Sequence, residues 1–290
     1  MNLKIFKVVI GCILIISIVI LIIKSTNKNS AEIYFMKLDN ADCTIVKYSG
    51  QVIVIDTGEK KDEKLIKEKL KKLNINCINY MILTHPDKDH IGSANDVIKK
   101  FEVQNIIQSG FNKGSDLQKE LTETIESKKI ENIIVNDRYE IKIDDMIIEI
   151  YGTKDGEYKK SNDNSLVTII KIGKRKICLA GDIEKDRIKE IEKQSLIEKC
   201  DILKVPHHGK SDKMSEKFIK KVEPKYAIIT SKKADDEVLK ILKDIKSKVY
   251  YTSNAEIKFM TNGKEMICKQ YKYWHIKKIA IKYEHNLKKE

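Results

Sequence analysis

The stretch "YMILTHPDKDHIGS" (80–93) gathers four potential metal ligands directly after an apolar run. These ligands are His85, Asp87, Asp89 and His90. The apolar run predicts a strand that ends at Thr84, and the residues after it predict a loop that leads into a helix. Because imidazole and carboxylate groups suit a catalytic divalent metal, this loop is a candidate metal site. A solvated acidic loop is the alternative interpretation of the stretch taken alone.

Three further apolar runs also stop at residues of the ligand type. The run "VIVIDTG" ends at Asp56, "KICLAGD" ends at Asp182, and "DILKVPHHG" ends at His207 and His208. Each of these, taken singly, also fits an ordinary turn. Together they favour a single site, because functional groups collect on loops at one edge of a rigid sheet scaffold.

The elements that must position these residues follow a regular order along the chain. Short strand-like runs come first, and strands then alternate with segments of helical spacing such as "DEKLIKEKLKKLNI". A hairpin is expected to turn at Gly173. No linker interrupts the sequence from residue 31 to about residue 270, and the pattern falls into two similar halves. It predicts one α+β domain in which two mixed sheets pack face to face with helices outside.

The first 30 residues form a separate unit of the sequence. An apolar run extends from Val8 to Ile23, has lysines on both sides, and is followed by the hydrophilic linker "KSTNKNS". The run lacks a small-residue cleavage signature, which predicts an uncleaved membrane anchor, residues 1–30 with the linker. We expect the domain of residues 31–290, with its basic tail (about 271–290), to lie outside the cell. A secreted protein is the alternative.

The net charge of the chain indicates which class of partner it favours. Its 290 residues include 56 lysines and arginines against 43 acidic residues, a formal net charge of +13. Such a charge favours anionic partners such as nucleic acid, anionic lipid or phosphorylated metabolites. A generic lysine-rich surface is the alternative, since the lysines are interleaved with Glu and Asp. The six cysteines include no C-x-x-C pair, which argues against a zinc ribbon and a disulfide framework.

The motifs "THPDKDHIG", "LAGD" and "LKVPHHG", in this order, resemble those of the metallo-β-lactamase superfamily. More narrowly, they are similar to the hydrolase domain of DNA-internalisation (competence) proteins of the ComEC type. The segment "NDNSLVTIIKIGKRKICLAGD" resembles the middle of that pattern. The segment "MKLDNADCTIVKYSGQVIVIDTG" resembles its opening hairpin, with Asp39 and Asp42 at the family's acidic positions. The resemblance spans residues 32–268 and implies an αββα sandwich with a dinuclear metal site at the sheet edge.

The resemblance also implies a role for each matching residue. The implied metal ligands are His85 and Asp87 for the first ion, Asp89, His90 and His207 for the second, and Asp182 as a bridge between the two. Asp89 would also orient the attacking hydroxide, and His208 would protonate the leaving group. The implied catalytic pair is therefore Asp89 and His208.

Two departures from the family pattern concern the metals. Asp87 stands where the superfamily commonly has a histidine, and no histidine occurs between His90 and His207. The resemblance implies two divalent ions, manganese or zinc. A site with more carboxylates and fewer histidines shifts the preference from zinc towards manganese or magnesium.

Four further residues are candidate substrate contacts. Asn164 and Ser165 match the neighbourhood of the missing histidine, and Lys210 and Ser211 follow the "HHG" turn. The two residues after the turn could contact a substrate anion. Plain turn residues are the alternative interpretation of that pair.

The resemblance implies a metallo-hydrolase that cleaves phosphodiesters, DNA in particular, by means of a metal-bound hydroxide. A hydrolase of small esters or lactones on the same fold is one alternative, because a fold does not fix a substrate. A binding protein with a degenerate metal site is the other. The family's hydrolase domain usually accompanies a multi-span pore, so a transport role would need a separate membrane channel protein.

Overall fold

The computed structural model describes residues 30–153 and 158–271. The predicted N-terminal membrane anchor and nearly all of the basic tail lie outside the described residues. Among the residues that are described, no helix has the length and apolar character needed to cross a membrane.

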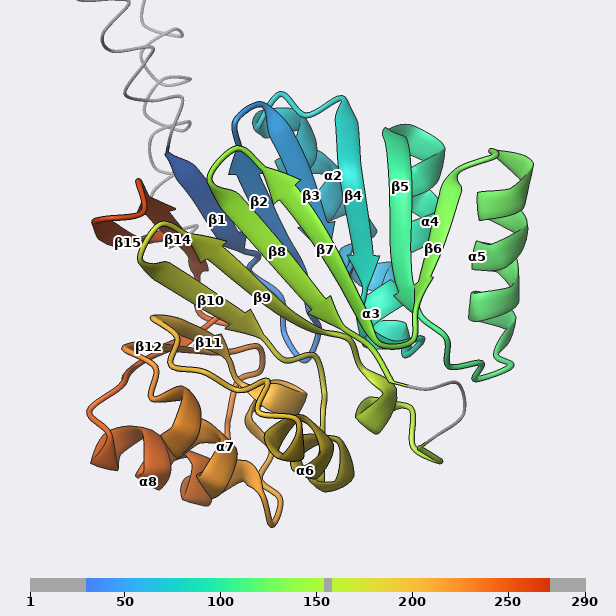
Figure 1. The fold of residues 1–290 in the computed structure, drawn as a ribbon. Helices are drawn as coiled ribbons and strands as arrows, with labels where there is room; N and C mark the ends of the chain where they lie inside the picture. The colour runs from blue at the N-terminus through green and yellow to red at the C-terminus, as the bar shows by residue number, and fades with distance from the viewer. Residues whose placement is uncertain (1–29, 154–157, 272–290) are drawn as a thin grey trace, which may run out of the picture.

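Two mixed β-sheets face each other in the described part of the chain (Figure 1). The first sheet has eight strands there, in the order β15 (Met266–Tyr271), β14 (Glu256–Thr261), β1 (Ala31–Phe35), β2 (Thr44–Tyr48), β3 (Gln51–Ile55), β4 (Cys77–Leu83), β5 (Glu102–Ser109) and β6 (Glu131–Val135). Neighbouring strands are antiparallel from β15 to β3 and parallel from β3 to β6.

The second sheet repeats this plan with seven strands among the described residues. Their order is β13 (Lys248–Tyr251), β12 (Tyr226–Ile229), β11 (Ile202–Lys204), β10 (Arg175–Leu179), β9 (Val167–Ile172), β8 (Met146–Tyr151) and β7 (Arg138–Ile143). Neighbours are parallel from β13 to β10 and antiparallel from β10 to β7. The two similar halves expected from the sequence are therefore present.

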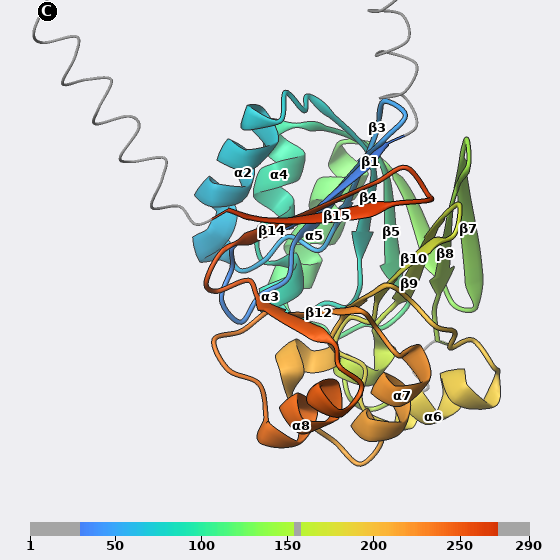
Figure 2. The same ribbon diagram turned by 90° about the vertical axis from the view of Figure 1, so that its left-hand side faces the viewer.

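Helices cover the outer face of each sheet. Those on the first sheet are α2 (Glu63–Lys72), α3 (Lys88–Ile91), α4 (Ala94–Lys100) and α5 (Asp116–Ser127). Those on the second are α6 (Lys185–Lys193), α7 (Ser215–Val222) and α8 (Asp236–Asp244). Short 3-10 turns are η1 (Lys60–Asp62), η2 (Asn162–Asn164) and η3 (Pro206–Gly209). Figure 2 shows α2 and α4 beside the first sheet and α6, α7 and α8 beside the second.

Apolar side chains fill the three interfaces that these layers create. The central cluster lies between the sheets and joins residues such as Phe35 of β1 to Ile170 of β9. A second cluster joins the first sheet to its helices through residues such as Leu70, and a third joins the second sheet to its helices through residues such as Phe218. The predicted αββα sandwich of two mixed sheets is thus confirmed.

The candidate ligands lie where strands of both sheets end. Asp56 follows β3, His85 follows β4, Asp182 follows β10, and the two histidines of η3 follow β11. Backbone hydrogen bonds connect these ends. The amide of Leu166 donates to the carbonyl of Thr84 at 2.9 Å, and the amide of His207 donates to that of Gly181 at 3.3 Å. The expectation that the polar strand ends share one edge therefore holds in the structure.

The turn that carries Asp89 and His90 is more elaborate than the sequence indicates. The predicted loop contains the separate short helix α3 before the longer helix α4 begins. Gly92 joins α3 to α4 at a place where the chain touches the loop after β3. A Cβ atom at Gly92 would lie 2.3 Å from the Lys88 carbonyl oxygen and 2.7 Å from the Glu59 Cα atom.

Replacement of Gly92 should therefore disturb the site through packing alone. We expect Gly92→Ala to lower the free energy of unfolding by about 3 kcal/mol, the upper part of the usual range for overpacking, because both contacts are with backbone atoms. Chemical denaturation measures this. Gly50→Ala is the control: its Cβ would meet nothing within 4 Å, and it should cost about 1 kcal/mol for its left-handed backbone. Equal costs for the two variants would contradict this account of the turn.

Candidate metal centre

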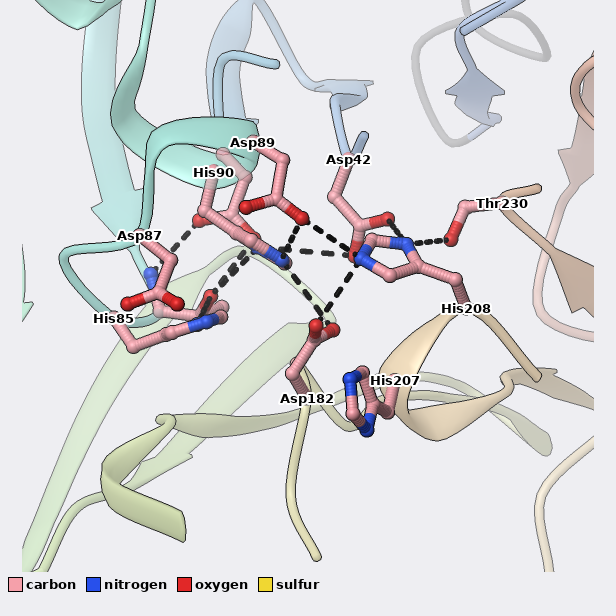
Figure 3. A network of polar contacts seen from close by, with 12 residues as sticks. Asp42, His85, Asp87, Asp89, His90, Asp182, His207, His208 and Thr230 are labelled. Carbon is pink, nitrogen blue, oxygen red and sulfur yellow. Dashed lines mark hydrogen bonds and ion pairs between the residues drawn. The ribbon is translucent and has the colours of Figure 1, made fainter. Parts of the chain in front are cut away.

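Four side chains from three loops bring their ligand atoms together at the sheet edge (Figure 3). Asp89, His90, Asp182 and His208 each offer one atom, and these atoms all lie within 4.8 Å of one another. His208 Nε2 lies 3.0 Å from Asp89 Oδ2 and 3.1 Å from Asp182 Oδ2. His90 Nε2 lies 3.3 Å from Asp182 Oδ1. We call these four residues the acidic-histidine cluster.

A carboxylate stands behind each histidine of the acidic-histidine cluster. Asp56 Oδ2 lies 2.8 Å from His90 Nδ1. Asp42 Oδ1 lies 3.3 Å from His208 Nδ1, which also lies 2.8 Å from Thr230 Oγ1. These contacts orient both rings so that Nε2 faces the other ligands. Such carboxylate–histidine pairs are the usual support of a metal-binding imidazole.

The two residues expected at the first metal have different surroundings. The ring of His85 lies against that of His90, with centroids 4.1 Å apart, and its Nδ1 lies 3.2 Å from Ser165 Oγ. Asp87 accepts hydrogen bonds from Lys113 Nζ at 2.9 Å and from Ser161 Oγ at 2.5 Å. The structure therefore places His85 beside the cluster, whereas Asp87 is engaged by two other side chains.

The adjacent histidines of η3 face different partners. His207 and His208 both have left-handed backbones, with φ of 48° and 54°, and their rings diverge. His207 lies outside the acidic-histidine cluster, with Nε2 3.2 Å from Lys210 Nζ and Nδ1 3.4 Å from Glu184 Oε1. The sequence-based assignment made His207 the ligand and His208 the proton donor. The geometry favours His208 as the ligand, because two successive left-handed residues place only the second ring against Asp89 and Asp182.

The four expected substrate contacts divide into two pairs. Ser165 Oγ lies at the site and accepts a hydrogen bond from the Asp182 amide at 3.1 Å, and Lys210 lies beside His207. Asn164 is fully buried, and its Nδ2 donates a hydrogen bond to the carbonyl of Lys160 at 2.7 Å. It therefore stabilises the loop that contains it. Ser211 donates its amide hydrogen to Asp235 Oδ2 at 2.8 Å, away from the cluster.

Lys204 of β11 is a residue that the sequence analysis missed. Its side chain is buried, and its ammonium donates to Asp42 Oδ2 at 2.5 Å, Asp182 Oδ1 at 3.0 Å and the Gly181 carbonyl at 2.8 Å. Burial opposes its charge, but Asp42 and Asp182 outweigh that effect and hold the pKa of Lys204 above its usual value. A lysine within an apolar run is normally interpreted as a residue on the exposed face of a strand. Only its location directly before "VPHHG" could have indicated otherwise.

The carboxylates also set the pKa values of the histidines. Burial opposes protonation of His208, yet Asp182 and Asp42 raise its pKa to about 10. Burial likewise opposes protonation of His90, but Asp182 and Asp56 outweigh it and raise the pKa of His90 well above its usual value. Burial and the nearby charge of His90 lower the pKa of His85 to about 3. These shifts favour the protonated form of His90 and His208 and the neutral form of His85.

The donor set fits a divalent metal. Within the described residues, the buried Nε2 atom of His85 makes no hydrogen bond, whereas that of His90 faces the carboxylates of Asp182 and Asp89. An unpaired buried nitrogen is costly unless something binds it. Two imidazoles and two carboxylates at one point are the ligand types of zinc and manganese sites. Asp89 is the partly exposed member and leaves the cluster open to solvent on its side.

Comparisons with solved structures bear on the fold. Igni18, a metallo hydrolase from the archaeon Ignicoccus hospitalis, is 16% identical and has a TM-score of 0.50; the match covers 84% of this chain and 100% of that one. YhfI of Bacillus subtilis, a metallo-beta-lactamase fold protein, is 11% identical with a TM-score of 0.50 over 77% of this chain and 95% of that one. At these identities the likeness shows the fold alone.

Sequence comparisons are more specific. ComE operon protein 3 of Bacillus subtilis is 32% identical over 173 residues, which are 59% of this chain and 22% of that protein. Recombination protein 2 of Haemophilus influenzae is 25% identical over 225 residues, 76% of this chain and 26% of that protein. The chain thus spans about a quarter of the length of these relatives. The expected resemblance to competence proteins of the ComEC type is confirmed.

The family model described as the metallo-beta-lactamase superfamily matches residues 36–230. This range holds both sheets' central strands and every residue of the acidic-histidine cluster. The chain belongs to the metallo-beta-lactamase superfamily.

Proposed function

We propose that this protein is a metal-dependent hydrolase of phosphodiesters, with DNA as its substrate. The acidic-histidine cluster carries the proposal, because it offers two carboxylates and two imidazoles from one partly open edge. A cluster with this share of carboxylates suits the harder divalent ions, manganese in particular, which also bind phosphate oxygens. The expectation of two ions, manganese or zinc, remains a prediction, with His85 and Asp87 as ligands of the first.

The chain's own residues divide the work of the proposed reaction. A divalent ion held by the cluster would supply an activated water and a positive centre for a phosphoryl oxygen. Asp89, the exposed ligand, would orient the attacking water. His207, which lies beside Lys210 and Glu184, would contact a leaving oxygen. His208, which the sequence analysis made the proton donor, would serve as a ligand.

Basic residues near the cluster support an anionic substrate. Lys113 Nζ lies 2.9 Å from Asp87 Oδ1, and Lys210 Nζ lies 3.2 Å from His207 Nε2. Lys160 forms an ion pair with Glu184. The formal net charge of +13 acts in the same direction. One relative is named for recombination, which is a process of DNA. These observations favour a nucleic acid over a small neutral ester or lactone.

We propose in addition that the N-terminal apolar run anchors the chain in a membrane, with the hydrolase domain outside the cell. The sequence contains one such run, from Val8 to Ile23. A separate membrane channel protein is the partner that we propose for this chain.

Activity on DNA tests the proposed substrate. The purified protein with Mn²⁺ should cleave DNA, and the double variant Asp89→Ala/His90→Ala should lose at least about 100-fold in rate, because it lacks half of the cluster. Gel electrophoresis of single- and double-stranded substrates measures this. Cleavage of a chromogenic lactone without cleavage of any phosphodiester would contradict the proposal.

The two histidines of η3 give a matched pair of variants. His208→Ala should weaken metal binding by more than the 10–100-fold typical of supporting residues, because the cluster loses a ligand. His207→Ala should change metal affinity little and should lower the rate of cleavage instead. Elemental analysis and calorimetric titration with Mn²⁺ measure the affinity. Loss of metal in His207→Ala with retention in His208→Ala would restore the assignment made from the sequence.

Metal affinity should rise with pH. Their carboxylate neighbours raise the pKa of His208 to about 10 and that of His90 well above its usual value, so a metal must displace protons from both rings at neutral pH. We expect release of about two protons per ion bound. Titration calorimetry in buffers of different ionisation enthalpy measures the release. An affinity that does not depend on pH, with no proton released, would be inconsistent with ligation by these two rings.

A further inference from the structure

Lys204 brings a positive charge into direct contact with the acidic-histidine cluster. Its side chain is 3% exposed, and all three of its ammonium hydrogens have an acceptor: Asp42, Asp182 and the carbonyl of Gly181. Asp182 is itself a member of the cluster, and Asp42 supports His208 of the cluster. One ammonium thus connects a ligand to the support of another ligand.

We propose that Lys204 is an internal counter-ion that keeps the cluster assembled when no metal is bound. The proposal rests on the proposed metal centre and deepens it. In the metal-free protein, Asp42 and Asp182 are both buried, and they approach one ammonium from two sides. Without the ammonium, only the imidazoles of His90 and His208 would offset these two buried carboxylates, and the remaining repulsion would favour local unfolding. The lysine removes that cost, so the ligands stay in place for the metal.

The same charge has an opposite effect on metal affinity. The ammonium lies 3.0 Å from Asp182 Oδ1, so it stands within a few ångströms of any cation that Asp182 binds. At such separations, like charges repel strongly in a protein interior. Lys204 therefore stabilises the metal-free state more than the metal-bound state. Its removal should make folding depend on the metal and should make the metal bind more tightly.

The direction in which metal affinity changes when Lys204 is removed distinguishes a counter-ion from a merely structural residue. A structural residue, when removed, loosens the ligands and weakens metal binding. A counter-ion, when removed, leaves Asp42 and Asp182 with only the imidazoles of His90 and His208 beside them, and a divalent ion gains by supplying the missing positive charge. Asp42→Asn should act in the reverse direction, because it removes a negative charge and leaves the ammonium to act on Asp182 alone.

The test measures the metal-induced rise in Tm and the Kd for Mn²⁺ of the full chain. We expect Lys204→Met to have a lower Tm than the unmodified protein after treatment with EDTA. Its rise in Tm on addition of Mn²⁺ should be at least twice that of the unmodified protein, and its Kd should be at least about tenfold lower. Asp42→Asn should show a smaller rise and a higher Kd. Lys204→Arg, which keeps the charge, should resemble the unmodified protein.

Lys69→Met is the matched control. Lys69 of α2 is the lysine of another buried ion pair, with Glu256 Oε1 at 2.6 Å, and it joins α2 to β14 outside the cluster. Its replacement should lower Tm with and without Mn²⁺ by the same amount and should leave the Kd unchanged.

Three results would overturn the proposal. The first is a metal-induced rise in Tm that is unchanged or smaller in Lys204→Met. The second is a change in the Kd for Mn²⁺ of the same sign and size in Lys204→Met and Asp42→Asn. The third is a Lys204→Met protein that stays unfolded with Mn²⁺ present. If the unmodified protein itself binds no Mn²⁺ and shows no rise in Tm, the proposed metal centre fails instead. The two failures are therefore distinguishable.

Discussion

The burial of negative charge at one sheet edge is the constraint on which the rest of this site depends. Asp42, Asp56 and Asp182 are each at most 5% exposed, and Asp89 has an oxygen within 4.8 Å of an oxygen of Asp182. Buried carboxylates persist in proteins only when cations or hydrogen-bond donors compensate them. Here the compensation comes from Lys204 and from protons on two imidazoles, His90 and His208. A divalent metal can replace the protons on the two imidazoles, and it is repelled by the ammonium of Lys204.

The sandwich makes this concentration of charge possible. Each sheet changes from antiparallel to parallel pairing near its middle, between β2 and β4 in the first and between β9 and β11 in the second. The carboxyl ends of these central strands carry the ligands, and the loops after them meet across the gap between the sheets. Three apolar interfaces hold the strands in place.

Much of this arrangement can be predicted from the sequence. The strand that ends at Thr84 and the hairpin at Gly173 follow from local patterns, because apolar runs and turn residues act over short distances. The ligand types of Asp89, His90 and Asp182 are likewise evident from their positions after apolar runs. Asp182 follows β10, and Asp89 and His90 lie in α3, which follows β4.

The remaining features depend on contacts that no local pattern encodes. The choice between His207 and His208 is made by two left-handed backbone residues in η3, which decide where each ring points. The support that Asp42 gives to His208 joins residues 166 positions apart, since it links the start of the domain to the loop after β11. Lys204 resembles any lysine in a strand until the fold places two carboxylates around it.

The most direct test of the account is the position of a bound metal. Anomalous diffraction from crystals of the protein grown with Mn²⁺ would locate the ion without reference to activity. The account predicts a peak within coordination distance of Asp89, His90, Asp182 and His208, with the ring of His207 outside that distance. A peak coordinated by His207 in place of His208, or no ordered ion at this edge, would contradict it.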